Sequence, residues 1–238
     1  MKNSFRFELS QLKSYRWIIV LMAFFSQLLS LYFFAIIGRF DTSESDDILR
    51  NYMTLSGLAS TICMCILVVY GTVMVNRFLV KNYIGESKIR FYLYPFGRSQ
   101  LFYTKVASFC GTFVLFQLLG ITLSNAIFLL TESLFPILIT SHHAFMHLTQ
   151  FLVTSISAVI LTISIIIISS ISGIFLNSTV ATIVTGIVLV VVFGNILAMS
   201  FASNLLVTLV SSIVIASISG LFVKMTGTKI EKDEVLTK

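Results

Sequence analysis

Residues 147–172 read HLTQFLVTSISAVILTISIIIISSIS and contain no Asp, Glu, Lys or Arg. They belong to a longer segment, residues 133–223, that lacks these four residue types throughout. A soluble domain needs charged groups on its hydrated surface and would scarcely tolerate such a segment. Because roughly 20 helical residues span the hydrocarbon core of a bilayer, the segment has room for two or three membrane spans, and its length favours three.

The composition of the whole chain agrees with a membrane location. Of the 238 residues, 57% are hydrophobic and 11% are charged, and the mean hydropathy is +0.98. Consecutive apolar residues, as in Ile165–Ile168, break the alternation that a transmembrane β-strand requires. We therefore expect an all-α polytopic membrane protein, with residues 1–238 forming a single transmembrane domain.

Six spans are expected, and their flanking charges predict an orientation. The spans fall near residues 17–38, 52–76, 106–131, 147–172, 179–198 and 204–223, which puts both termini on one side. Cytoplasmic loops are enriched in Lys and Arg, and of the 16 such residues only Arg39 and Arg50 lie in the expected outer loops. The termini, the loop 77–105 and the tail 224–238 are thus predicted to be cytoplasmic. The 14 other cations are Lys2, Arg6, Lys13, Arg16, Arg77, Lys81, Lys88, Arg90, Arg98, Lys105, Lys224, Lys229, Lys232 and Lys238.

The basic charge balance follows from this topology. The sequence pI is about 9.3, and cations on the cytoplasmic side also attract anionic lipid. The charge therefore gives no support to nucleic-acid binding.

Residues 1–16 precede the first span and allow two interpretations. They place Phe5, Leu9 and Leu12 at helical spacing, with cations available for lipid headgroups, which is typical of a helix lying in the membrane interface. A positive flank that orients the first span explains the same residues. The apolar run from Trp17 to Ile37 is too long for the core of a secretory signal, so we expect it to stay as a span.

The outer loops contain two groups of polar residues, to which we assign no metal site. His143 and His147 are four residues apart and would share a helix face, but the HExxH pattern of a zinc hydrolase is absent. An acidic group in the first outer loop is best explained as a solvated surface. The residues concerned are His142, His143 and His147 in one loop and Asp41, Glu44, Asp46 and Asp47 in the other.

Inside the spans, ionisable groups are nearly absent, which disfavours a transporter driven by protons. Uncharged polar residues recur at helical spacing, either as contacts between closely packed helices or as the lining of a substrate path. The candidate path residues are Gln117, Ser124, Thr154, Ser157 and Ser164. The three cysteines, Cys63, Cys65 and Cys110, fall inside spans without metal or redox spacing.

The sequence contains no recognisable catalytic machinery. A phosphate loop of the form GxxxxGK[ST] is absent, as is a plausible nucleophilic or metal-hydrolase set. We therefore expect a chain that is not an enzyme and carries no cofactor of its own. Any energy for its work would come from a partner.

The basic loop between the second and third spans, residues 77–105, reads RFLVKNYIGESKIRFYLYPFGRSQLFYTK. Residues Glu86–Tyr94 predict a short amphipathic helix that ends at Pro95 and Gly97. The loop is too short to be a domain. A short helix held between two spans could receive force from a cytoplasmic partner.

Leu93, Tyr94, Pro95, Arg98 and Lys105 resemble the loop of ABC-2 type ABC transporter permeases, especially the small six-span permeases of bacteriocin and lantibiotic immunity and peptide export. In that family a coupling helix is followed by an apolar stretch, a Pro, an Arg and a Lys before the third span. The family's usual Glu lies earlier than Glu86, so the role of this residue stays open.

The resemblance implies a permease subunit in the bacterial cytoplasmic membrane that works with separate ATP-binding cassette subunits and a second permease copy or paralogue. ATP and Mg would bind to the partner ATPase. The substrate would be amphipathic or hydrophobic, such as a bacteriocin-like peptide. A six-span substrate-binding subunit for small-molecule uptake and a metal-dependent membrane enzyme are the alternatives. The implied ATPase-coupling residues are Arg77, Lys81, Glu86, Lys88, Arg90, Tyr92, Leu93, Pro95, Arg98 and Lys105.

Overall fold

The computed structural model describes residues 2–40, 51–85, 97–135, 147–203 and 205–232, and this part of the chain is helical, without strands. The expected all-α fold is thus confirmed for the described residues. The elements are α1 (Lys2–Gln11), the 3₁₀ helix η1 (Leu12–Tyr15), α2 (Arg16–Phe40), α3 (Tyr52–Phe78), the 3₁₀ helix η3 (Val80–Tyr83), α5 (Arg98–Leu134), α6 (Leu148–Phe175), α7 (Thr179–Ser203) and α8 (Leu205–Lys232).

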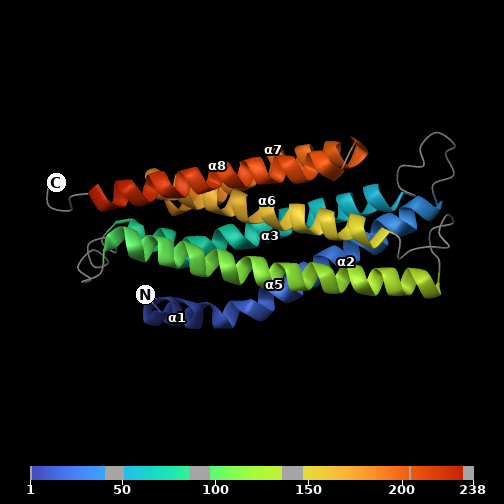
Figure 1. Cartoon of the computed structure of the whole chain (residues 1–238), viewed down its shortest axis with the longest axis horizontal. Coiled ribbons are helices and arrows are strands. Elements are labelled where there is room, and N and C mark those ends of the chain that lie inside the picture. The colour runs from blue at the N-terminus through green and yellow to red at the C-terminus, as the bar shows by residue number, and fades with distance from the viewer. Residues whose placement is uncertain (1, 41–50, 86–96, 136–146, 204, 233–238) are drawn as a thin grey trace.

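The helices α2, α3, α5, α6, α7 and α8 lie side by side as an elongated bundle, and α1 lies outside it against α5 (Figure 1). Helix α1 and the last turns of α8 are at the same end of the bundle (Figure 1). We call this the terminal end; it also carries η3 and the first turns of α5. The opposite end, with Arg39, Asn51, Glu132 and His147, is the distal end.

In the described part of the chain, five helical stretches are long and apolar enough to cross a membrane: Phe5–Phe40, Tyr52–Tyr83, Arg98–Leu134, Leu148–Phe175 and Leu206–Lys232. Five of the six expected spans are therefore present as helices of spanning length. In α7 the described stretch Thr179–Asn195 is apolar but shorter. A sixth span remains a prediction.

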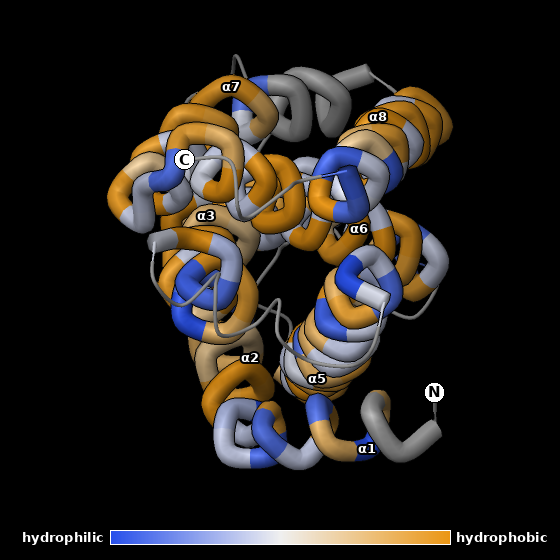
Figure 2. The backbone as a smooth tube through the Cα atoms, turned by 90° about the vertical axis from the view of Figure 1, so that its left-hand side faces the viewer, coloured by the Kyte–Doolittle hydropathy of each residue, from blue (hydrophilic) through white to orange (hydrophobic). Residues whose placement is uncertain are grey.

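The outward surface of the bundle is apolar, as contact with lipid requires. On α2, Leu21, Phe25 and Leu29 recur every fourth residue and are about half or more exposed, whereas Ala23 and Ser30 face the interior. The hydrophilic segments gather instead at helix ends, as the view onto the terminal end shows (Figure 2). This distribution is that of a multi-pass membrane protein.

Helix α5 begins eight residues before the expected start of the third span at residue 106. Phe102, in the added turns, is fully buried and meets the Tyr83 ring edge-on at 5.5 Å between centroids. Burial of this ring stabilises helix where a loop was expected. The connection between α3 and α5 is therefore shorter than the expected loop of residues 77–105, because the last part of that range belongs to α5.

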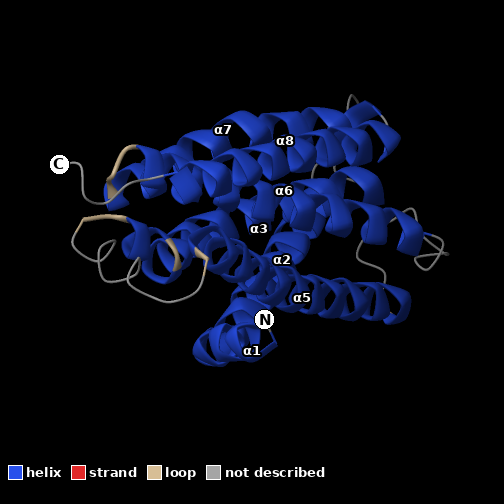
Figure 3. Ribbon diagram, turned by 60° about the vertical axis from the view of Figure 1, so that its left-hand side comes forward, coloured by secondary structure: helices blue, strands red, loops and turns tan. Residues whose placement is uncertain are grey.

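Helices α2 and α5 approach closely at Gly120. A Cβ atom there would lie 2.6 Å from Ala23 Cβ and 2.8 Å from the Val20 carbonyl oxygen. Only glycine allows this distance between the backbones. The described helices of the bundle enclose a large apolar cluster around this contact and a smaller one, with Tyr52 and Phe128, toward the distal end. Helix α1 projects to one side of the bundle (Figure 3).

Candidate functional site at the terminal end of the bundle

Four of the ten predicted coupling residues lie in the described part of the chain: Arg77, Lys81, Arg98 and Lys105. The structure gathers them at the terminal end, near α1 and η1. Arg77 and Lys81 are exposed and Arg98 is half-buried. The predicted coupling helix lies outside the described residues, and so do Glu86, Lys88, Arg90, Tyr92, Leu93 and Pro95.

Lys105 points into the protein. Its Nζ lies 3.4 Å from Glu8 Oε2 of α1, and the two residues are 5% and 7% exposed. The same Nζ lies 4.8 Å from the ring centroid of Phe78 at the end of α3. Lys105 thus joins α1, α3 and α5, and it does not present its charge to the exterior.

The end of α3 is shaped by local hydrogen bonds. The Leu79 amide donates to the Val75 carbonyl at 2.8 Å, and Asn82 Nδ2 donates to the Phe78 carbonyl at 2.8 Å. These bonds satisfy carbonyls that lack partners at a helix end and turn the chain into η3. As a result Tyr83 is buried against α5 and Lys81 is directed outward.

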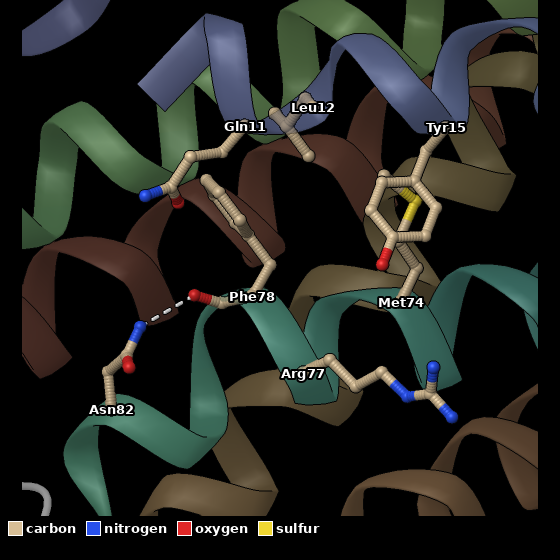
Figure 4. Close-up of a pocket in the computed structure, with 7 residues that line it drawn as sticks. All are labelled: Gln11, Leu12, Tyr15, Met74, Arg77, Phe78 and Asn82. Carbon is tan, nitrogen blue, oxygen red and sulfur yellow. Dashed lines mark hydrogen bonds between the residues drawn. The ribbon is translucent and has the colours of Figure 1, made fainter. Parts of the chain in front are cut away.

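A cavity of about 300 Å³ lies between the N-terminal helical segment and the end of α3. The close-up shows that Gln11, Leu12 and Tyr15 form one wall and that the opposite wall comes from α3 and η3 (Figure 4). The second wall consists of Met74, Arg77, Phe78 and Asn82. One predicted coupling residue, Arg77, therefore borders a cavity.

The five candidate path residues are buried and make hydrogen bonds within the chain, while Gln117 Oε1 is buried without a partner in the described part of the chain. Gln117 Nε2 donates to Thr162 Oγ1 at 3.1 Å, between α5 and α6. Ser124 Oγ donates to the Phe24 carbonyl of α2 at 2.8 Å. The hydroxyls of Thr154, Ser157 and Ser164 donate to carbonyls of their own helix. Within one chain these hydrogen bonds are those of closely packed helices, one of the two interpretations of the sequence.

A polar network that the sequence did not single out joins four helices. Gln27 Nε2 of α2 lies 3.3 Å from Ser60 Oγ of α3 and 3.2 Å from Asn125 Oδ1 of α5. Asn125 Nδ2 donates to Ser155 Oγ of α6 at 2.8 Å. The signal that could have found it is the presence of two amide side chains inside apolar runs, where polar groups are costly unless paired.

Glu8 is a further residue whose role the sequence did not reveal. It is the one acidic residue among residues 1–40, in a segment otherwise rich in cations. A lone carboxylate there suggests a specific ion pair. Its partner could not be inferred, because Lys105 is almost one hundred residues away.

At the distal end, Glu132 is buried and accepts a hydrogen bond from the Tyr52 hydroxyl at 3.2 Å. The Tyr52 ring stacks on His147 at 4.8 Å between centroids, and His147 Nδ1 lies 2.9 Å from Gln150 Oε1. Among the described residues there is no group of three or more His, Cys, Asp or Glu that could hold a metal ion. His142 and His143 lie outside them, as do Asp41, Glu44, Asp46 and Asp47.

Comparisons with protein families, with curated proteins and with solved structures found no match to this chain. A function therefore has to be argued from its residues and geometry.

Proposed function

We propose that this chain is the membrane-spanning permease subunit of an ATP-driven exporter of the ABC-2 type. In this proposal α2, α3, α5, α6, α7 and α8 are the six spans, and the terminal end faces the bacterial cytoplasm. The segment between η3 and α5 contains the coupling helix. Two permease copies, or this chain and a paralogue, would stand over two separate ATPase subunits, which bind ATP and Mg.

The observation that carries the proposal is the concentration of cations at the terminal end. The described residues Arg77, Lys81 and Arg98 lie there with the basic N-terminal segment and the end of α8, whereas Arg39 lies at the distal end. The basic loop of residues 77–105 contains more cations than orientation of the spans requires. The chain has no phosphate loop of its own, so a motor would have to dock from outside.

The packing of the terminal end supports transmission of force. Glu8, Phe78 and Lys105 tie α1, α3 and α5 together, so a push on the loop between α3 and α5 would move these elements as one unit. ATP-driven closure of the ATPase pair would bring the two coupling loops together. This would favour one of two arrangements of the permease pair over the other.

The cargo in this proposal is an amphipathic or hydrophobic molecule taken from the membrane, such as an antimicrobial peptide. The candidate path residues are engaged inside one chain, so the path would run between the two permease copies. Expression of the chain with its ATPase should raise resistance to at least one peptide in a panel. Unchanged sensitivity across the panel would refute this cargo class.

The coupling role is tested with the purified permease–ATPase complex. Deletion of residues 86–97, and separately the double variant Lys81→Gln/Arg98→Gln, should weaken association and lower permease-stimulated ATP hydrolysis several-fold. Arg39→Gln removes a cation from the distal end and is the matched control, with stimulation expected to stay at the parental level. Undiminished association and stimulation in the deletion variant would refute the proposal.

A further inference from the structure

The cavity beside Arg77 has a gradient of polarity. Gln11 and Arg77 are exposed, Tyr15 and Asn82 are half-buried, and Leu12 is fully buried. The apolar side chains of Met74 and Phe78 continue this inner part of the lining. Arg77 runs along the wall that α3 contributes, across from the segment that carries Gln11 and Tyr15 (Figure 4). A ligand with a charged head and an apolar body matches such a gradient.

The cations around the cavity are not equally available. Arg16 donates from Nη2 to the Leu9 carbonyl at 3.1 Å and lies over the Phe116 ring at 5.6 Å, so it is directed elsewhere. Glu8, three residues before Gln11, is neutralised by Lys105. Arg77 has no carboxylate partner among the described residues and therefore offers its charge to a ligand. Lys13 and Lys81, both exposed, lie on the segments that form the two walls.

The amide groups add further hydrogen-bonding capacity. Asn82 Nδ2 is used by the Phe78 carbonyl, which leaves its Oδ1 as an acceptor for a hydroxyl group. Gln11 brings both a donor and an acceptor to the opposite wall. Figure 4 shows the Arg77 guanidinium on the side of the cavity where Tyr15 lies, away from Gln11 and Asn82, so an anionic group paired with Arg77 would meet the Tyr15 hydroxyl.

The location of the cavity agrees with a lipid ligand. It lies where the spanning helices α2 and α3 reach the terminal end, beside a helical segment outside the bundle whose Phe5 and Phe7 are exposed. Basic pockets between helices at the cytoplasmic end of a bundle are typical sites for anionic lipid headgroups. The volume of about 300 Å³ is at the small end of ligand pockets, so it admits a headgroup and the start of an acyl chain.

We propose that this cavity binds an anionic phospholipid. Its phosphate would pair with Arg77 beside the Tyr15 hydroxyl. Its acyl chain would pass over Leu12, Met74 and Phe78 toward the membrane. The site goes beyond the proposed export function, because it requires neither the ATPase nor the cargo.

The test uses the full-length chain alone, purified in detergent and titrated in native mass spectrometry with phosphatidylglycerol, phosphatidylcholine or glycerol 3-phosphate. Phosphatidylglycerol should bind more tightly than both other probes. Arg77→Gln should weaken its binding about fivefold, the contribution expected of one basic residue near an anionic surface. Arg77→Lys should retain most of the affinity. Arg39→Gln at the distal end and Lys232→Gln at the terminal end are controls that should bind as the parent does.

A second variant tests the cavity itself and leaves the charge intact. Tyr15→Phe keeps the ring and should fold, and it should weaken phosphatidylglycerol binding because it removes the hydroxyl beside Arg77. Equal binding of the two phospholipids would overturn the proposal, as would losses in the controls equal to that in Arg77→Gln. Glycerol 3-phosphate binding as tight as that of the lipid would show a soluble phosphate site instead. Because no ATPase is present, none of these results depends on the export function.

Discussion

Helices α2, α3, α5 and α6 are joined differently from α7 and α8. The first four share the side-chain network around Gln27 and Asn125, deep in the bundle. Helices α7 and α8 meet the others at glycines, as at Gly186 against Thr72 and Gly227 against Tyr103. Helix α7 also makes hydrogen bonds near the terminal end, where Asn76 Nδ2 donates to the Thr179 carbonyl and Ser172 Oγ lies 2.7 Å from Thr185 Oγ1. In the most apolar stretch of α6, 61% of residues are buried, against 22% in that of α8.

The difference predicts that the two groups of helices differ in mobility. Hydrogen bonds have directional requirements, so the network holds its four helices in one register. The described residues of α7 and α8 take no part in this network. We therefore expect α2, α3, α5 and α6 to behave as a rigid unit, with α7 and α8 as the part that can shift or meet a second chain. Substitutions in the four-helix unit should therefore cost more stability than substitutions in α8.

Lys105→Met should lower the free energy of unfolding by about 3 kcal/mol, since it leaves the Glu8 carboxylate buried without its cation. Adding Glu8→Gln should recover much of the loss. Thermal unfolding in detergent measures both effects. Lys229 of α8 lies over the Phe175 ring at 4.2 Å but is exposed, so Lys229→Met should cost less than 1 kcal/mol. Similar losses for the two lysine variants would contradict the importance of the ion pair.

Gly120→Ala should destabilise the protein by roughly 1–3 kcal/mol, because the added methyl group meets Ala23 and the backbone of α2. Gly111→Ala is the control on the same helix, where a Cβ meets nothing within 4 Å. It should be neutral or slightly stabilising. Equal melting temperatures for the two variants would show that α2 and α5 are not held at this close distance.

Asn125→Ala should cost roughly 1–2 kcal/mol, since it removes two hydrogen bonds between helices and leaves Gln27 and Ser155 with fewer partners. Ser164→Ala removes a hydroxyl that bonds only to its own helix backbone, and a loss of under ~0.5 kcal/mol is expected. Chemical denaturation in mixed micelles can compare the two. A larger loss for Ser164→Ala would reverse the ranking that the network implies.

Gly220→Ala on α8 should have the smallest effect, a gain of about 0.5 kcal/mol, because a Cβ there meets no atom within 4 Å and alanine favours helix. The effect should appear as a small rise in the unfolding temperature of the chain purified alone. A clear destabilisation in the isolated chain would place α8 inside a tightly packed unit and contradict the contrast with α2, α3, α5 and α6.

Hydropathy predicted the helical class and the position of five spans, because long apolar runs leave a chain few alternatives in a bilayer. It did not predict that α5 begins eight residues before residue 106, because the burial of Phe102 and the pairing of Lys105 with Glu8 depend on distant parts of the chain. The contacts of Gln27 and Asn125 could not be predicted either. They depend on which helix faces which, a long-range property that one sequence does not encode locally.

The candidate site was predicted only in part. The sequence placed Arg77 in the basic loop, and the structure shows that Arg77 borders a cavity at the terminal end. The other wall of that cavity comes from residues 11–15, which the sequence presented as a flank or an interfacial helix. Proximity between the two segments arises from tertiary packing, so neither the cavity nor its gradient of polarity could be foreseen.

The export proposal is tested most directly by purifying the tagged, full-length chain from its own membrane in mild detergent and identifying the proteins that remain bound. We predict an ATP-binding cassette subunit in roughly equal amount, with ATP hydrolysis that falls when residues 86–97 are deleted. A folded, lipid-bound chain that retains no ATPase would contradict the proposal that this chain is the permease subunit of an ATP-driven exporter.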